Sequence, residues 1–337
     1  MMDAKELLNK YKDLGMAEVI RYNPDVYCDV ASIPRWDIPE KIILGVAVTG
    51  SFIDKRQNPD QPYTAEEVLR EAEECISAGA TYLHFHVRDK EGRNIGDVES
   101  YNKIVQPLRR KYGDKLLIDG CPLFGKDFEE ANAPVTEDLF EIGIVNPVCT
   151  FVSDNIRYLP PPTIKAQCEY FQALGKKVML SVHDTASIDN INRFLIRPGI
   201  LKKPYFFVIL SDLPGMFYMP NPRAMVEGFS LLVNRLKELD PDCQIMVCAS
   251  GRASSYLAAL AVIMGLHLRV GTEDTIWRYP HRDEKIKNNL QTFNTAKALC
   301  DVLGREIATA DEIKGILGIP TADKIGSARV MSKTCLT

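Results

Sequence analysis

The 337-residue sequence lacks the features that mark membrane proteins and nucleic-acid-binding proteins. No run of about eighteen apolar residues occurs, so we expect no membrane-spanning segment. Lys and Arg (41) do not outnumber Asp and Glu (45), and no basic stripe accompanies the net charge of −4, which argues against a nucleic-acid surface. The first residues also lack the apolar core of a signal peptide, and we expect a cytoplasmic protein.

Two nucleotide-binding motifs and the paired cysteines of structural zinc sites are also missing. No Gly-x-Gly-x-x-Gly follows the first predicted strand, and no P-loop occurs. The nine cysteines form no Cys-x-x-Cys pair, and most lie in apolar runs, so we expect reduced core residues. Only Cys121 lies in a loop flanked by Gly and Pro, which leaves a cysteine nucleophile as a minor alternative.

From residue 41 onward, short apolar strands alternate with helical segments. The eight predicted strands are apolar throughout, as is typical of strands covered on both faces, and span residues 42–48, 82–87, 116–118, 145–151, 178–182, 205–210, 244–249 and 267–270. Strict alternation implies a parallel sheet, and eight β/α units close a (β/α)8 TIM barrel. An open doubly wound sheet is the alternative, but the missing glycine motifs argue against it.

The barrel pattern does not extend over the whole chain. Residues 1–40 contain one short helical segment and several prolines, and we expect an N-terminal arm. Residues 41–319 are predicted to form the catalytic barrel domain. Residues 320–337 are predicted to form a C-terminal tail.

His84 and His86 are two residues apart in the second predicted strand, inside an apolar run. The period of two puts both imidazoles on one face of the strand. Two core histidines that each bond to the backbone would show the same spacing. Side-by-side imidazoles at the end of a buried strand are nevertheless typical of a metal site, and we expect zinc or another divalent ion here.

Active sites of (β/α)8 barrels lie at the C-terminal ends of the strands. Glu273 follows strand eight, which only strand one separates from strand two, so it could complete a His2Glu metal site. Arg269 and Asp274 could pair beside this metal, with Asp274 as the general base. A solvated loop that caps the next helix is the alternative for the Glu273-Asp274 pair, and His183 is an alternative ligand.

Several motifs resemble the β-keto acid cleavage enzymes, whose founding activity is cleavage of 3-keto-5-aminohexanoate. The likeness covers residues 41 to about 319 and identifies the chain as a divergent member. It is carried by Val48-Thr49-Gly50, Asn58-Pro59, Pro62-Tyr63-Thr64, His84-Phe85-His86-Val87-Arg88-Asp89, Gly251-Arg252, Gly265-Leu266-His267-Leu268-Arg269-Val270-Gly271-Thr272-Glu273-Asp274 and Gly304-Arg305-Glu306-Ile307-Ala308-Thr309.

The resemblance implies a zinc ion held by His84, His86 and Glu273. It also implies a reaction in which a β-keto acid and acetyl-CoA give acetoacetate and a new acyl-CoA. In that family the residue matching Asp274, oriented by the one matching Arg269, removes the acidic proton of the keto acid. The enolate attacks the acetyl thioester, and a retro-Claisen step releases acetoacetate. A homotetramer is implied as well.

The sequence departs from the family around the substrate. Phe52 stands where the founding enzyme has a Glu that receives the amino group of the substrate. The Ser-Thr-Gly loop after strand three is replaced by residues 119–122, and the Glu-x-Phe-Asp motif of strand five by residues 181–184. We therefore expect a substrate other than 3-keto-5-aminohexanoate, contacted by Thr49, Phe52, Gly120, Cys121, His183 and Arg252. A metal-dependent hydrolase or aldolase, and a non-catalytic metal- or ligand-binding barrel, are the alternatives.

Overall fold

The computed structural model describes residues 3–14, 30–121, 125–152 and 155–320. The chain divides into two compact units, residues 1–38 and residues 39–337. The described part of the first unit contains helix α1 (Ala4–Tyr11), which begins at a capping box of Asp3 and Glu6, and the 3-10 turn η1 (Val30–Ser32). Residues 321–337 of the predicted tail lie outside the described residues.

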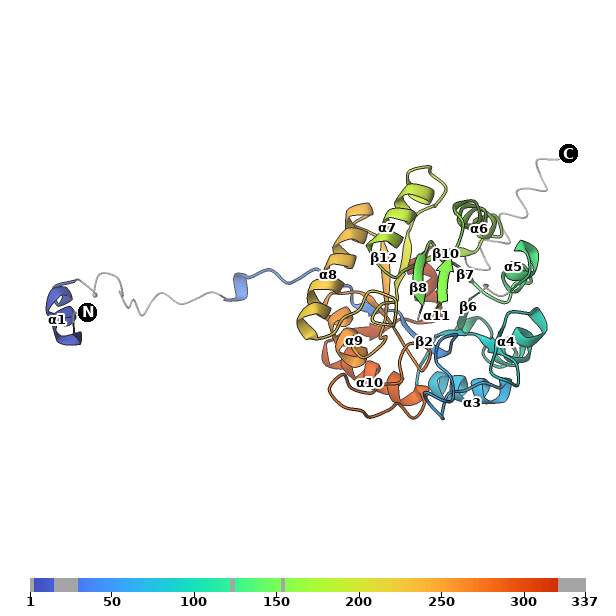
Figure 1. Ribbon diagram of the computed structural model, residues 1–337, viewed down its shortest axis with the longest axis horizontal. Helices are drawn as coiled ribbons and strands as arrows, with labels where there is room; N and C mark the ends of the chain where they lie inside the picture. Colours follow the sequence, from blue (N-terminus) through green and yellow to red (C-terminus); the bar gives the residue numbers. More distant parts are fainter. Residues whose placement is uncertain (1–2, 15–29, 122–124, 153–154, 321–337) are drawn as a thin grey trace. The chain divides into compact units, whose positions relative to one another are not determined.

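The second unit is built on a closed barrel of eight strands (Figure 1). All neighbouring strands pair in parallel, and the last pairs with the first. Around the barrel the strands are β2 (Leu44–Thr49), β3 (Tyr82–Phe85), β6 (Leu117–Gly120), β7 (Ile142–Val145), β10 (Lys177–Val182), β11 (Phe206–Ile209), β12 (Gln244–Cys248) and β13 (His267–Val270). The predicted (β/α)8 fold is confirmed.

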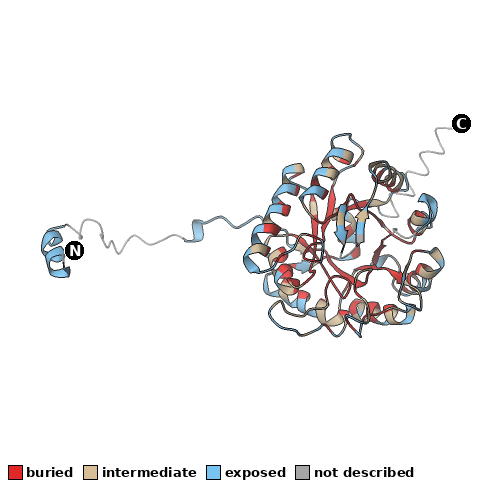
Figure 2. Ribbon diagram, in the orientation of Figure 1, coloured by how far each residue is buried: buried red, intermediate tan, exposed pale blue. Residues whose placement is uncertain are grey.

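Helices surround the barrel and bury one face against it (Figures 1 and 2). They are α3 (Ala65–Ser77), α4 (Val98–Tyr112), α5 (Phe128–Thr136), α6 (Pro161–Ala173), α7 (Thr185–Ile191), α8 (Pro222–Leu239), α9 (Ser254–Ile263) and α10 (Asn289–Val302). α3 begins at the predicted capping box, in which Thr64 and Glu67 each accept a hydrogen bond from the backbone of the other. Among the described residues, no helix has both the length and the apolar character to cross a bilayer.

The strands are mostly apolar, and both of their faces are buried (Figure 2). The buried apolar side chains form two clusters, one between strands and helices and one inside the barrel. In β11, Phe207 and Ile209 belong to the first cluster, and Phe206 and Val208 belong to the second. The inner cluster also includes residues of α11 (Ala310–Leu317), so this helix packs against barrel-lining side chains. The short strand β14 (Glu306–Ile307) pairs with β1 (Lys41–Ile42).

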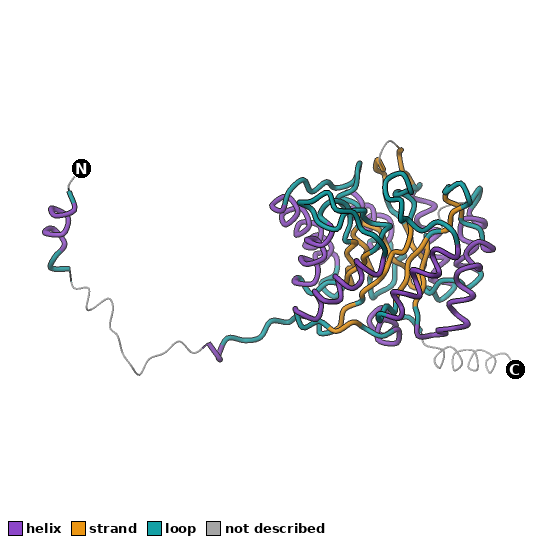
Figure 3. The backbone as a smooth tube through the Cα atoms, turned by 90° about the horizontal axis from the view of Figure 1, so that it is seen from below, coloured by secondary structure: helices purple, strands orange, loops and turns teal. Residues whose placement is uncertain are grey.

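The fourth strand differs from the prediction. Strand 145–151 was expected, but β7 ends at Val145, and Cys149–Val152 forms β8 of an antiparallel hairpin with β9 (Asn155–Tyr158). Apolar residues lie on both sides of Asn146-Pro147, so hydrophobicity alone does not show which group enters the barrel. Pro147 has no N–H to donate to a central ladder, and the barrel strand ends before it. The hairpin lies over the centre of the barrel (Figures 1 and 3).

Arg305 ties together chain segments at the N-terminal end of the barrel. Its guanidinium group is buried and donates to the carbonyl oxygens of Val262 and Leu266 at 3.1 and 3.3 Å, and of Lys41 at 3.0 Å. Strand β1, helix α9 and the turn before β13 are thus held by one side chain. A single buried cation thus donates to carbonyl oxygens of three separate segments.

We predict that Arg305→Met lowers the free energy of unfolding by about 2–3 kcal/mol, because these buried carbonyls lose their donor. Denaturant or thermal unfolding measures the loss. Arg223→Met is the matched control, since the Arg223 side chain is 86% exposed on α8. Equal unfolding midpoints for the two variants would contradict the role given to Arg305.

Candidate active site

Three buried side chains meet at the C-terminal mouth of the barrel. His84 belongs to β3, His86 follows this strand, and Glu273 follows β13, with one ligand atom of each within 4.8 Å of the others. Nε2 of His84 lies 2.9 Å from Oε2 of Glu273, and Nε2 of His86 lies 3.6 Å from Oε1. Ligands about 2.0 Å from a tetrahedral ion are about 3.3 Å apart, which falls between these distances. The group could therefore hold a metal ion.

The hydrogen bonding of this group also fits a metal ion. Nε2 of His84 and Oε2 of Glu273 are buried, and neither makes a hydrogen bond within the described part of the chain, although they are 2.9 Å apart. Buried polar atoms normally have a partner. Two buried atoms this close can share a cation, which is a proton in an ion pair or a metal ion that both atoms ligate.

Asp119 orients His84 from the neighbouring strand β6. Its carboxylate accepts hydrogen bonds from Nδ1 of His84 at 2.7 Å and from the hydroxyl of Tyr82 at 2.6 Å. A proton on Nδ1 leaves the lone pair of Nε2 for a metal ion, which is the usual arrangement of metal-binding histidines. The Ser51 hydroxyl is the corresponding neighbour of His86, 2.8 Å from its Nδ1.

The charges around the two histidines favour a cation between them. Burial disfavours the charged form of His84, but the carboxylates of Glu273 and Asp119 outweigh it and raise its pKa to about 9. Burial acts to raise the pKa of Glu273, yet His84 and Arg269 hold that pKa well below its usual range. A positive charge, whether a proton or a metal ion, is thus stabilised at this point.

Arg269 and Asp274 form a buried two-pronged ion pair beside the group. Nε and Nη2 of Arg269 donate to the two oxygens of Asp274 at 3.0 and 2.5 Å, and Nη2 lies 3.3 Å from Oε1 of Glu273. Burial raises the pKa of Asp274 to about 6, against the opposing effect of Arg269. A carboxylate that is fixed in place and titrates near neutrality suits a general base.

The loop after β2 is held in place by Arg88, the Arg of the His-x-His-x-Arg motif. Its guanidinium group donates to the carbonyl oxygens of Gly50 and of Ile53, the latter at 2.8 Å, and stacks on the Tyr63 ring at 4.8 Å. This loop carries Ser51, the neighbour of His86. Arg88 therefore supports the metal group indirectly.

The metal group and Arg269 lie in a pocket with an open volume of about 410 Å³. Its other lining residues are Phe52, Cys121, Ile144, Asn146, Arg157, Ser181, His183, Val208 and Leu210. The predicted substrate residues Phe52, Cys121 and His183 are thus brought together around the metal group, although His183 is not part of that group. Burial raises the pKa of the Cys121 thiol to about 12, so it is protonated near neutral pH, which argues against a nucleophile.

The other predicted substrate residues do not line this pocket. The Thr49 hydroxyl is buried and bonds to the Pro62 carbonyl oxygen at 2.8 Å. Gly120 ends β6, and a Cβ there would meet the Phe140 ring at 2.6 Å. Arg252 stacks on Trp277 at 3.6 Å and pairs with an exposed Asp. Substrate contacts of these three residues remain predictions.

Sequence reasoning missed several residues of the site. In the sequence, Asp119 is only the first residue of the altered loop 119–122, and its bond to His84 depends on the register of β3 and β6. Ser51 and Arg157 were not singled out. The position of Arg157 follows from the β8–β9 hairpin, which the apolar pattern concealed.

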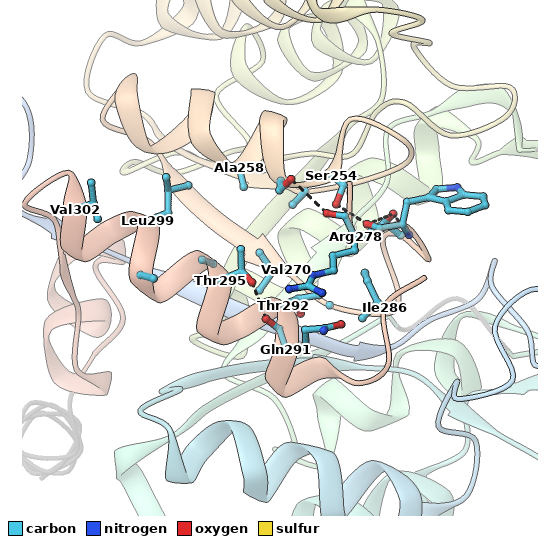
Figure 4. A pocket seen from close by; sticks show the side chains of 17 residues that line it. Ser254, Ala258, Val270, Arg278, Ile286, Gln291, Thr292, Thr295, Leu299 and Val302 are labelled. Atoms are coloured by element: carbon cyan, nitrogen blue, oxygen red, sulfur yellow. Dashed lines mark hydrogen bonds between the residues drawn. The ribbon is translucent and has the colours of Figure 1, made fainter. Parts of the chain in front are cut away.

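A larger pocket lies away from the metal group, between α9 and α10 (Figure 4). Its open volume is about 920 Å³, and its lining is mostly apolar, with Ala258, Val270, Leu299 and Val302 among the contributors. None of the predicted metal, base or substrate residues lines it. Chemistry therefore belongs to the smaller pocket at the barrel mouth.

Fold and site together define a (β/α)8-barrel enzyme with a potential metal group in a pocket and a buried arginine–aspartate pair beside that group. A family model described as beta-keto acid cleavage enzyme matches residues 41–319. The chain belongs to the β-keto acid cleavage enzyme family, which confirms the resemblance read from the motifs.

Individual relatives agree with this family. The 3-keto-5-aminohexanoate cleavage enzyme of Fusobacterium nucleatum is 32% identical over 284 residues, which cover 83% of this chain and 98% of that protein. The 3-oxoadipate:acetyl-CoA acetyltransferase of Cupriavidus necator is 24% identical over 285 residues, covering 83% and 96%. The solved apo structure of ObcA shares the fold, with a TM-score of 0.65 at 20% identity over 78% of this chain and 66% of that one.

Glycine at position 50 makes room for Glu273, because a Cβ there would lie 2.1 Å from its Cγ. We predict that Gly50→Ala displaces Glu273 and weakens metal binding about tenfold or more. Titration with zinc against a fluorescent chelator measures the affinity. Gly315→Ala, where a Cβ meets nothing within 4 Å, is the control. Unchanged zinc affinity in the Gly50 variant would show that Glu273 does not depend on this space.

The bond between Asp119 and His84 leads to a second prediction about the metal. Asp119→Asn removes the charge that orients the imidazole, and we expect the affinity for zinc to fall about 10- to 100-fold. The same titration measures it, with Asp242→Asn, an exposed carboxylate far along the chain, as the control. Wild-type affinity in the Asp119 variant would remove Asp119 from the metal site.

Proposed function

We propose that this chain is a zinc-dependent enzyme that transfers acyl groups between a β-keto acid and acetyl-CoA. The products are acetoacetate and a new acyl-CoA. The observation that carries the proposal is the meeting of the potential metal group and Arg269 in one pocket, with the buried carboxylate of Asp274 bonded to Arg269. Acetyl-CoA as co-substrate is supported by the names of family relatives, several of which are acetyl-CoA transferases.

His84, His86 and Glu273 are the proposed zinc ligands. Zinc, when bound, supplies a Lewis acid that polarises the keto oxygen and stabilises negative charge on it. Two imidazoles and one carboxylate leave an open position for this oxygen, as catalytic zinc sites require. The donor set alone does not select zinc, and another divalent metal would satisfy the same chemistry.

Asp274 is the proposed base. It takes the proton from the carbon between the keto and carboxylate groups, and Arg269 holds its carboxylate in position. The carbanion forms a bond to the acetyl carbon, and the CoA thiolate leaves. The thiolate then adds to the original keto carbon, the bond between this carbon and its acidic neighbour breaks, and the neighbour recovers the proton from Asp274. Atoms and electrons balance: acetoacetate and an acyl-CoA result.

The substrate is proposed to differ from 3-keto-5-aminohexanoate. Phe52 and Arg157 both line the pocket, and the Arg157 guanidinium lies 5.6 Å from the centre of the Phe52 ring. The positive charge of Arg157 repels an ammonium group, and Phe52 has no carboxylate to pair with one. A cytoplasmic homotetramer, with residues 41–319 as the catalytic domain, completes the proposal. The tetramer and the domain rest on the resemblance, and the compartment is supported by the free cysteines of the described residues, most of which are buried.

The test is a panel of β-keto acids offered with acetyl-CoA to the zinc-loaded enzyme, with acetoacetate as the measured product. Formation of acetoacetate that stops on chelation and returns with zinc supports the proposal. No acetoacetate from any keto acid, with zinc bound, overturns it. Turnover without CoA would favour the hydrolase or aldolase instead.

The base leads to a prediction about rate. Asp274→Asn keeps the size of the side chain but cannot accept the proton, so we expect kcat to fall about 10²- to 10⁴-fold while zinc content stays at the wild-type level. Acetoacetate formation and metal analysis measure the two quantities. Asp311→Asn, 84% exposed on α11, is the control. A kcat within a factor of two of wild type would exclude Asp274 as the base.

A further inference from the structure

Arg157 places a positive charge in the pocket that the proposed mechanism does not use. It comes from β9 of the hairpin over the barrel mouth (Figures 1 and 3). Among the described residues it has no carboxylate partner. Its guanidinium group lies over the Phe52 ring in a cation–π contact. Arg269, by contrast, is neutralised by Asp274. No described side chain therefore neutralises Arg157.

His183 adds a second unused polar group. It is 1% exposed and lines the pocket, and within the described part of the chain its Nδ1 has no hydrogen-bond partner. Burial and the nearby charge of Arg157 lower its pKa to about 4, so the imidazole is neutral near pH 7. A neutral imidazole can donate one hydrogen bond. A buried polar side chain without a partner indicates a site completed by a ligand.

The surroundings of these two residues limit the kind of ligand. Ile144, Val208 and Leu210 supply apolar contacts on the same pocket wall. The hydroxyl of Ser181 already donates to Asn146 at 2.6 Å. The only unpaired charge offered by the described lining, apart from the metal group, is that of Arg157. An anionic group on a short aliphatic chain matches this lining.

The position of the hairpin decides which end of the substrate meets Arg157. The keto group and the acidic carbon must lie between the metal group and Asp274, which are buried at the strand ends. The hairpin extends beyond these ends (Figure 3). A substrate bound by its reactive end therefore directs its other end toward Arg157.

We propose that Arg157 and His183 bind a second carboxylate at the far end of the substrate, so that the enzyme acts on dicarboxylic β-keto acids. This inference rests on the proposed function for the reaction but concerns a separate part of the pocket. Phe52 holds the guanidinium group by a cation–π contact, and the apolar wall contacts the methylene groups between the two ends.

The test compares two substrates that differ only at the far end. They are 3-oxoadipate, with a second carboxylate, and 3-oxohexanoate, with a methyl group. The wild-type enzyme is expected to have a kcat/KM at least about tenfold higher for the diacid. Arg157→Met should lower kcat/KM for the diacid about 10- to 100-fold and leave that for the monoacid within about twofold, because a charge-assisted hydrogen bond is lost only with the former. Arg157→Lys should retain an intermediate preference.

A binding measurement separates this inference from the proposed reaction. Calorimetry of adipate and hexanoate with the zinc-loaded enzyme needs neither acetyl-CoA nor turnover. We expect Arg157→Met to lose adipate binding and His183→Asn to bind adipate more weakly than the wild type. This result supports the site even if no acetoacetate is formed. Arg223→Met, exposed on α8, controls for the change in net charge.

Three outcomes overturn the inference. One is an equal fall in kcat/KM for both keto acids in Arg157→Met, which would mean that Arg157 binds the carboxylate of the reactive end. Another is a wild-type preference for the monoacid. The third is adipate binding that does not change in Arg157→Met. In each case acetoacetate formed from some other keto acid would leave the proposed reaction intact.

Discussion

Closure of the barrel between β13 and β2 is the constraint on which the site depends. Strand β13 pairs in parallel with β2, so the last barrel strand in the sequence lies next to the first. Only then does Glu273 reach the imidazole of His84 from the far end of the sequence. The metal group is therefore a tertiary structure feature: an open sheet with the same strands would leave its members on opposite edges.

Closure also collects charges that would be costly to bury singly. Glu273, Asp274, Asp119 and Arg269 are almost fully buried within one network. Each carboxylate is matched by a guanidinium group, an imidazole or a hydroxyl, and removing one partner would leave another uncompensated. This coupling explains why the carboxylates differ in behaviour: the pKa of Glu273 is held low by His84 and Arg269, whereas burial raises that of Asp274. One acts as a permanent anion and the other can exchange a proton.

Much of this arrangement could be predicted from the sequence because it follows from local patterns. Fully apolar runs separated by capped helices specify parallel strands, and period two places His84 inside the barrel. The fourth strand could not be located this way, since apolar residues lie on both sides of Asn146-Pro147 and only the first group enters the barrel. Nor could the bond from His84 to Asp119 be foreseen, because it depends on the register between neighbouring strands. Local patterns predict secondary-structure elements. The register between strands and inserted segments such as the hairpin determine which side chains meet in the site.

The β8–β9 hairpin is joined to the barrel at both ends but shares no ladder with its strands. The groups proposed for chemistry come from the barrel strands and the turns directly after them, whereas Arg157 is carried on this attached segment. The charge proposed to select the substrate therefore comes from a different part of the chain than the groups proposed for the reaction. Replacement or a change in length of the hairpin could change the range of keto acids that the enzyme accepts. The packing of the barrel and its buried network would stay the same.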